Sequence, residues 1–432
     1  MKIEINKSFF KKLPSRIIIL LMYYFEVTIA PFISKYLFFI YWPFYVFFLK
    51  TNYRFLFNIA DGVGDNIPVL DNFFRARTLK ELNPKIKYIM IRRNNDFCRT
   101  IVKLYGNLFA FSSSSNIFYC LILPMLMRYR NITLDAGLSR CKWYLPDREH
   151  NSLPPRWQTN QYLVSKKETH QYWIDWYRRR SLTPNFFLLR SHIKEIKFNG
   201  SFDTTNKKIA LIHIKTDIVN ATACVTNPDT YLPAINYLLN NNFFIVFVGR
   251  EKMPEIFKQY NIYNYANSNE ANFQNDLSLF CLAKLAITAG SGISYLADCF
   301  NTPCLFLNSW HIFKPPFSES CIQIPTLIAD TTGKLLDFVD QANLYHSLPD
   351  KYNEIFPKDK FMAINASSEE ILTGLKELIS SNEKLLPITN EQKLFNQLDP
   401  NGWLKYAKSR ISQNFLMKHK GLLESSFLKI VN

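Results

Sequence analysis

The second half of the chain alternates short apolar runs with amphipathic stretches. Phe243–Val248 has no polar alternation, as expected of a strand that is covered on both faces. Thr230–Asn241 follows Pro228-Asp229 and gathers its apolar positions on one helical face. Further strands are predicted at Ile209–Ile214, Leu285–Thr288 and Cys304–Leu307, and further helices at Asp276–Lys284, Ile293–Phe300 and Ile371–Ser380. Alternating strands and helices with right-handed crossovers predict a Rossmann-like parallel sheet.

The first half begins with the same pattern. Phe55–Ala60 predicts a buried strand, the turn Asp61-Gly62-Val63-Gly64-Asp65 follows, and a helix is expected from about Ile67 to Leu82. Tyr88–Ile91 predicts the next strand, so we expect an α/β chain with two Rossmann-like domains. Residues 100–190 are less regular. Their tryptophans and the run Arg178-Arg179-Arg180 predict either a basic aromatic binding surface or a solvated helix end beside core aromatics.

The N-terminal 60 residues are apolar and basic, with eight Lys or Arg and two acidic residues. Their apolar runs, Ile17–Phe25, Val27–Ile33 and Tyr36–Leu49, are each shorter than the ~20 residues of a spanning helix. The favoured interpretation is a monotopic anchor with Tyr and Trp at headgroup depth and lysines against anionic lipid. Three alternatives are a cleaved signal peptide, a kinked pair of spans, and an apolar helix docked on the domain itself.

Composition narrows the class of partner. The chain has 432 residues, is 48% apolar and carries a formal net charge of +17, so it has a large core and favours anionic partners. No nucleic-acid motif accompanies the charge, and we expect no nucleic-acid partner. The eight cysteines are scattered without a CxxC pair, which favours reduced thiols in a cytoplasmic protein.

The most informative segment is the turn Thr288-Ala289-Gly290-Ser291-Gly292, between a predicted strand and a predicted helix. The first N–H groups of a helix are unpaired and lie at its positive dipole end, so such a turn can bind a phosphate. We expect a diphosphate held by backbone N–H groups and by the hydroxyls of Thr288, Ser291 and Ser294. The turn is neither a Walker motif nor a dinucleotide fingerprint, and a plain tight turn is the alternative.

Further polar residues follow the other predicted strands, where ligands bind in parallel sheets. The binding candidates at these positions are His213, Lys215, Gly249, Arg250 and Asn308. Asp65 would begin a helix, where its ionised carboxylate suits either a general base or a cap. The chain has no Asp-x-Asp triplet, no zinc-type His/Cys spacing and no Gly-x-Ser-x-Gly. We therefore expect a site without metal or other cofactor.

These segments resemble a family of bacterial glycosyltransferases of the two-Rossmann (GT-B) type found with surface-polysaccharide genes. The resemblance is carried by His213-Ile214-Lys215, Asp229 to Ile235, Thr288 to Ser294, and Asn365 to Ile371. The Asp61–Asp65 turn is similar to the first glycine loop of heptosyltransferases. Lys215 and Phe247 depart from the family, which has Arg at the first position and often Arg at the second.

The resemblance implies a metal-independent, inverting glycosyltransferase acting on a nucleotide-sugar donor and a glycan or lipid-linked acceptor. Asp65 and His213 would be catalytic, Gly62 and Gly64 would lie on the acceptor side, and the other strand-end and turn residues would bind donor. Alternatives are an epimerase of the same fold and a non-catalytic membrane-surface protein. We expect a peripheral location on the cytoplasmic face of a bacterial inner membrane. The expected segments are 1–54 (membrane-associating), 55–200 (acceptor domain), 201–385 (nucleotide-sugar domain) and 386–432 (C-terminal helical tail).

Overall fold

The computed structural model is a mixed α/β structure that divides into two compact units. It describes residues 17, 21–22, 24–56, 63–129, 132–134, 166–183, 207–216, 225–313, 315–347, 359–384, 386–399 and 402–431. Unit 1 comprises residues 1–61 and 80–164, and unit 2 comprises residues 62–79 and 165–432. The helices that begin and end the expected acceptor domain therefore belong to unit 2 by their contacts, and the four linear segments predicted above stay a prediction.

Unit 1 is built on a four-stranded parallel sheet in the order β3-β2-β1-β4. Its strands are β1 (Tyr53–Leu56), β2 (Lys87–Arg92), β3 (Phe111–Ser114) and β4 (Thr133–Leu134). Its helices are η1 (Phe25–Ile29), α2 (Ala30–Tyr36), η2 (Phe38–Tyr41), α3 (Trp42–Lys50), α5 (Asp96–Tyr105), η3 (Gly106–Leu108) and α6 (Asn116–Arg128). The strand expected at Phe55–Ala60 begins two residues earlier, and residues 57–60 lie outside the described part of the chain.

The N-terminal helices pack their inner face onto α6. Ala30 and Ser34 of α2 are buried, and Met22 and Ala30 share an apolar cluster with Leu123 and Leu126 of α6. On this inner face the N-terminal segment packs on its own domain, which is the last of the four interpretations given above. Within the described residues no single helix is long and apolar enough to cross a membrane, although the bent pair Ala30–Tyr36 and Phe38–Lys50 passes on length and composition together, with an angle of 85° between its halves.

Unit 2 contains the predicted Rossmann-like sheet, with seven parallel strands in the order β13-β10-β9-β8-β5-β6-β7. The strands are β5 (Lys208–His213), β6 (Phe243–Phe247), β7 (Ile262–Tyr263), β8 (Leu285–Ala289), β9 (Cys304–Ser309), β10 (Cys321–Pro325) and β13 (Arg410–Ile411). A separate antiparallel pair is formed by β11 (Leu327–Asp330) and β12 (Phe361–Ile364). Buried residues along β5, β6 and β8 confirm that these strands are covered on both faces.

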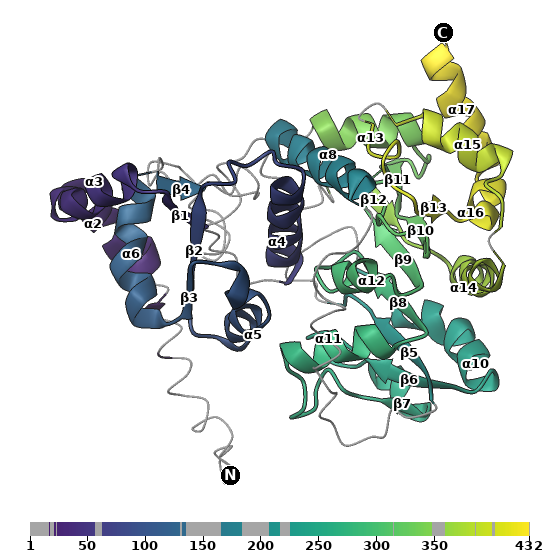
Figure 1. The fold of residues 1–432 in the computed structure, drawn as a ribbon. Helices are drawn as coiled ribbons and strands as arrows, with labels where there is room; N and C mark the ends of the chain where they lie inside the picture. The colour runs from purple at the N-terminus through teal and green to yellow at the C-terminus, as the bar shows by residue number, and fades with distance from the viewer. Residues whose placement is uncertain are drawn as a thin grey trace. The chain divides into compact units, whose positions relative to one another are not determined.

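The helices of unit 2 come from three parts of the chain (Figure 1). They are α4 (Val63–Thr78), α8 (Lys166–Leu182), η7 (Pro228–Tyr231), α10 (Leu232–Asn240), η8 (Glu255–Gln259), α11 (Phe273–Leu282), α12 (Ser294–Phe300), α13 (Phe338–Ser347), α14 (Ser368–Glu383), α15 (Asn390–Gln397), α16 (Gln413–Lys418) and α17 (Lys420–Val431). Phe395, Phe415 and Leu423 of the C-terminal helices lie in the main core of this unit. The expected C-terminal tail is thus an integral part of unit 2.

A buried polar cluster joins α4, α8 and α12. Asp71 of α4 accepts hydrogen bonds from Arg75 at 2.7 Å and from Trp176 of α8 at 2.6 Å. Arg180 of α8 forms an ion pair with Asp298 of α12, and both side chains are about 4% exposed. The interpretation of residues 178–180 as a solvated helix end is wrong for Arg179 and Arg180, because both are buried: Arg179 donates to Asn72, and Arg180 pairs with the buried Asp298. The core position of Trp176 is confirmed.

Candidate functional site

The predicted site residues of unit 2 lie at one edge of its sheet. The strands β9, β8, β5 and β6 are consecutive parallel neighbours, so their carboxyl ends share that edge. His213 at the end of β5 is the register partner of Thr288 on β8, and Ile212 is the partner of Phe247 on β6. The structure therefore brings together His213, the turn after β8 and the loop that carries Gly249 and Arg250.

Two of the three hydroxyls expected to bind a phosphate have partners within the chain. Thr288 is fully buried, and its Oγ1 lies 3.3 Å from Sγ of Cys304. The Ser294 hydroxyl donates to the backbone carbonyl of Ser291, which closes the turn. The third hydroxyl belongs to Ser291, which is half-buried. No partner of its side chain is recorded in the described parts of the chain. Donor contacts by Thr288 and Ser294 stay predictions, and the structure assigns both hydroxyls a local structural role.

The helix after the turn begins at Ser294, one residue later than expected. The N–H groups of Ser294, Tyr295 and Leu296 donate to the carbonyls of Ser291, Gly292 and Ile293, and that of Gly290 donates to Leu307. Among the described residues, no acceptor is recorded for the N–H groups of Ser291, Gly292 and Ile293, as expected for the first amides of a helix. Residues 290–292 are half-buried rather than enclosed. Three adjacent amides are thus the donors that this turn offers to an anion.

His213 is paired with a carboxylate that the sequence analysis missed. Its Nε2 lies 3.3 Å from Oε2 of Glu251, the imidazole is almost fully buried, and its Nδ1 has no hydrogen-bond partner among the described residues. Burial raises the pKa of Glu251, but the hydrogen bond and charge of His213 and the backbone N–H groups of Glu251 and Arg250 outweigh it and lower the pKa to about 2. An ionised carboxylate only accepts hydrogen bonds, so Nε2 of His213 carries a proton. The signal for Glu251 was its place after Gly249-Arg250 at a strand end.

Gly249 is required by the close approach of this loop to His213. Its φ is +114°, a conformation that L side chains rarely adopt, and an added Cβ would lie 2.6 Å from Cδ2 of His213. Arg250 is exposed, and its backbone N–H donates to Glu251 at 3.1 Å. Lys215 is half-buried and follows the end of β5. Lys215 follows His213 closely in the sequence, and Arg250 directly precedes Glu251, so each member of the His213–Glu251 pair has a cation near it at its strand end.

Asn308 has a structural role at the end of β9. It is fully buried with a φ of +57°, its Nδ2 donates to Oγ1 of Thr226 at 2.8 Å, and its Oδ1 accepts from the backbone N–H of Ala366 at 2.9 Å. The side chain thus joins β9 to the segment before η7 and to the start of α14. Since its amide is used within the chain, a contact between Asn308 and a donor stays a prediction.

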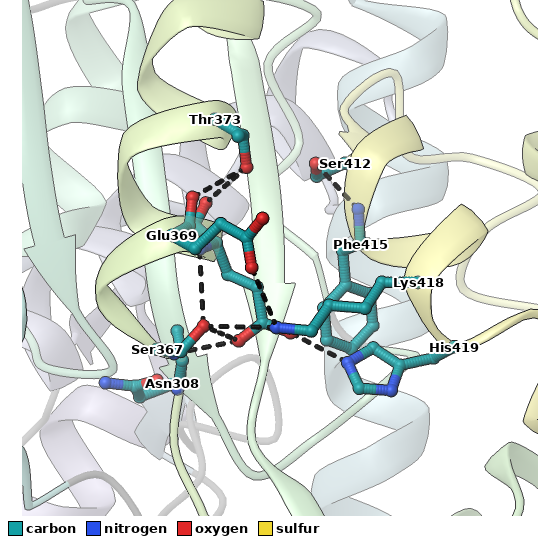
Figure 2. A network of polar contacts seen from close by, with 10 residues as sticks. Asn308, Ser367, Glu369, Thr373, Ser412, Phe415, Lys418 and His419 are labelled. Atoms are coloured by element: carbon teal, nitrogen blue, oxygen red, sulfur yellow. Dashed lines mark hydrogen bonds and ion pairs between the residues drawn. The ribbon is translucent and has the colours of Figure 1, made fainter.

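The N-terminus of α14 is closed by its own side chains (Figure 2). Ser367 and Glu370 form a capping box, and Glu370 also lies 2.7 Å from Nε2 of His419 and 3.4 Å from Nζ of Lys418. Burial raises the pKa of Glu370, but the hydrogen bonds from His419 and Ser367 and the charge of Lys418 lower it to about 2. This second helix start at the same edge is therefore already occupied by a carboxylate.

The predicted acceptor-side residues are only partly described. Gly64 and Asp65 form the first turn of α4, so the helix begins four residues before its expected start at about Ile67. The side chain of Asp65 and all of Gly62 lie outside the described residues. The structure does place α4 beside α12, within unit 2. The catalytic role of Asp65 and the acceptor roles of Gly62 and Gly64 stay predictions. Among the side chains described, no group of three His, Cys, Asp or Glu could hold a metal ion.

Comparison with known proteins finds relatives only among solved structures. No protein-family model matches the chain, and no curated protein matches it. The structure of ADP-heptose lipopolysaccharide heptosyltransferase II from E. coli is 14% identical with a TM-score of 0.40, over 76% of this chain and 99% of that one. The iron-containing dodecameric glycosyltransferase TibC from enterotoxigenic E. coli is 10% identical with a TM-score of 0.39, over 76% of each chain. The UDP-GlcNAc 2-epimerase from Methanocaldococcus jannaschii is 9% identical with a TM-score of 0.29, over 76% of this chain and 99% of that one.

The chain is therefore similar to heptosyltransferases, the proteins that its early glycine turn resembles in sequence, and the predicted resemblance is confirmed. At TM-scores of 0.40 and below, the likeness carries no argument about substrate or chemistry. The functional case rests on the geometry of the sheet edge.

Proposed function

We propose that the protein is a metal-independent, inverting glycosyltransferase of the GT-B type. It would move a sugar from a nucleotide-sugar donor to a surface-glycan or lipid-linked acceptor. The observation that carries the proposal is the meeting, at one sheet edge, of three helix-start amides that have no acceptor among the described residues with a buried, carboxylate-paired histidine. Such an edge suits a diphosphate whose charge grows as the glycosidic bond breaks.

In the proposed reaction, an acceptor oxygen attacks the anomeric carbon while the bond from that carbon to the diphosphate oxygen breaks. The acceptor hydroxyl proton passes to a base, for which Asp65 is the candidate, and the electron pair of the broken bond stays on the diphosphate. The amides of Ser291, Gly292 and Ile293 would stabilise the negative charge that develops on the leaving group. Lys215 and Arg250 add positive charge near the same edge.

Glu251 would fix the orientation and tautomer of His213. With the proton on Nε2 directed at the carboxylate, Nδ1 is the atom left for a ligand: it accepts from a hydroxyl when the ring is neutral and donates to a phosphate oxygen when the ring is charged. We assign His213 to the leaving phosphate, which its Nδ1 would contact, and Glu251 to positioning the imidazole.

The lipid-linked acceptor places the enzyme at a membrane in this proposal. The nucleotide-sugar donor and the apolar, basic N-terminus together favour the cytoplasmic face of a bacterial inner membrane, with the protein peripheral to it.

The test is a thermal-shift screen of the full chain against nucleoside diphosphates and nucleotide sugars. A ligand that binds the folded state raises the melting temperature by mass action. We expect at least one nucleoside diphosphate to do so, and NMR of the product formed from the matching sugar to show inverted anomeric configuration. Conversion of the free nucleotide sugar to its epimer without an acceptor would contradict a transferase. No shift with any nucleotide would contradict the binding site itself.

A further inference from the structure

The outer face of the N-terminal helices in unit 1 is apolar and exposed. Phe32 of α2, Phe39 of η2 and Phe44 and Phe47 of α3 are each 55–60% exposed, and Trp42 is 55% exposed. Single exposed apolar side chains are common, but large aromatic residues on three consecutive helices form a patch of the kind that marks an interaction surface.

Helix α6, which lies much later in the sequence, also carries exposed apolar side chains. Ile117, Phe118 and Leu121 are 73%, 48% and 58% exposed, and the Phe118 ring is in T-shaped contact with the exposed Phe111 ring at 6.3 Å. Figure 1 shows α6 beside α2, which it contacts. The sequence analysis assigned membrane contact to residues 1–54 and did not consider α6.

Specific contacts hold the N-terminal helices against α6. The Tyr129 hydroxyl, directly after α6, donates to the backbone carbonyl of Phe38 at 3.0 Å. The Tyr129 ring stacks on Tyr45 of α3 with centroids 4.1 Å apart. Sγ of Cys120 lies 3.7 Å from Sδ of Met22. The N-terminal helices are thus packed on α6 rather than hung from the domain as a separate anchor.

The charges on these helices have one sign. Within α2, η2, α3 and α6 the charged side chains are Lys35, Lys50 and Arg128, all exposed, and these four elements contain no Asp or Glu. The Arg128 guanidinium lies over the Phe38 ring at 4.5 Å, next to the apolar patch. Cations beside an aromatic patch match an anionic lipid surface, where lysine and arginine meet headgroups and rings enter the interface.

The geometry favours lying on a membrane over crossing it. The helix α2 is about 10 Å long and the stretch from η2 through α3 about 20 Å long, and they meet at 85°, so neither covers the ~30 Å of a hydrocarbon core. Ala30 and Ser34 of α2 are buried, while Phe32 of α2 and Ile117 and Leu121 of α6 stay exposed for contact with a partner.

We propose that unit 1 docks on an anionic lipid bilayer through a composite face made of α2, η2, α3 and α6. The inference shares its membrane partner with the proposed function but does not depend on the donor site. It differs from an N-terminal anchor in one respect: exposed side chains of α6 are required for binding.

The experiment measures partition of the full chain onto vesicles of phosphatidylcholine with and without phosphatidylglycerol. Ile117→Asn with Leu121→Asn removes two exposed apolar side chains from α6, and we expect at least a tenfold loss of partition onto the anionic vesicles, since each side chain contributes roughly tenfold when it enters the interface. The matched control is Leu428→Asn with Val431→Asn on α17 of unit 2, which are also exposed and should leave partition unchanged. Circular dichroism and the thermal shift with nucleoside diphosphate check that both variants fold and keep the donor site.

Each outcome decides the proposal. Equal partition of the α6 variant and the parent protein would overturn the composite face, even if an α3 variant such as Trp42→Ser lost binding. Failure of the parent protein to bind either vesicle would overturn the lipid partner. A dimer in solution that the α6 variant dissociates would identify a second copy of the chain as the occupant instead. If no nucleoside diphosphate raises the melting temperature of the parent protein, that result would count against the proposed function and leave this inference standing.

Discussion

Two helices of unit 2 begin at the same edge of its sheet, and their starts are built differently. At α12 the amides of Ser291, Gly292 and Ile293 have no recorded acceptor among the described residues. At α14 the start is closed by the Ser367–Glu370 capping box, with His419 and Lys418 on the same carboxylate. A helix start that has its own carboxylate has no need of a ligand, while a start without one remains available to an anion. The comparison therefore assigns α12 to binding and α14 to structure.

The largest expected effect breaks the pair that adjoins the binding helix start. Glu251→Gln keeps the shape of the residue but removes the negative partner of His213, and we expect kcat to fall about 100-fold, a value in the lower range for loss of an acid–base or charge-stabilising group. Steady-state kinetics with the donor found in the thermal-shift screen would measure kcat. The conservative Glu251→Asp should recover part of the rate, and unchanged kcat in Glu251→Gln would remove Glu251 from the account.

Removing one amide tests the binding helix start directly. Ile293 has a φ of −68°, which suits proline, so Ile293→Pro deletes its N–H while fitting the local backbone. One hydrogen bond to a charged phosphate is worth about 1.5–3 kcal/mol, so we expect nucleoside diphosphate to bind about 10- to 100-fold more weakly. Ile293→Val is the matched control, because it also trims the side chain but keeps the amide. Calorimetric titration that gives the two variants the same affinity would contradict the assignment.

The structural helix start should respond to acid through its carboxylate. The pKa of Glu370 is lowered to about 2 in the folded protein, against 4.5 ordinarily, so its contribution is fully present above about pH 4.5 and is lost as the pH falls towards 2. The contribution is at most about 3 kcal/mol, and less after solvent screening. Urea unfolding of Glu370→Gln should show a flatter loss of stability between pH 5 and about pH 3 than the parent protein. Affinity for nucleotide should not change, and a large loss of it would place Glu370 in the binding site.

The close packing of α14 gives a smaller effect. A Cβ at Gly374 would lie 2.7 Å from Cδ1 of Ile324 and 3.1 Å from Cδ1 of Leu305, so Gly374→Ala should lower the free energy of unfolding by about 1 kcal/mol, overpacking outweighing the gain in helix propensity. Gly421→Ala on α17 is the matched control, since an added Cβ there meets nothing within 4 Å and the substitution should be neutral or stabilising. Denaturant unfolding of both variants measures the difference. Equal free energies of unfolding for the two variants would show that the side chains around Gly374 move aside without cost, and would contradict the close packing.

The strands of the sheet were predictable because each one is a short run of apolar residues that can be recognised from the local sequence. Those at 209–214, 243–248, 285–288 and 304–307 became β5, β6, β8 and β9, and their parallel pairing brought His213 next to Thr288. The side-chain partners were not predictable, because they depend on contacts between distant segments. Thr288 faces Cys304, Asn308 joins Thr226 to Ala366, and Glu251 reaches His213 across two strand ends.

The assignment of helices to units was also beyond local pattern. The helix α4 follows a strand of unit 1 in sequence, yet Asp71 and Arg75 lie in a buried cluster with α8, and α4 also contacts α12. The sequence suggested a surface position for Arg180, since a run of three arginines is usually solvated. Its partner, the carboxylate of Asp298, lies 118 residues away in the sequence. The outer face of α6 was missed for a similar reason, because its inner partner is the N-terminal segment.

The most direct test of the central claim is hydrogen exchange of the backbone amides with and without saturating nucleoside diphosphate. The account predicts slower exchange in the peptide that spans residues 290–295 and no change in the peptide that spans residues 366–371, because the first helix start binds the diphosphate and the second is closed by Glu370. Protection of the second peptide with none at the first would contradict it.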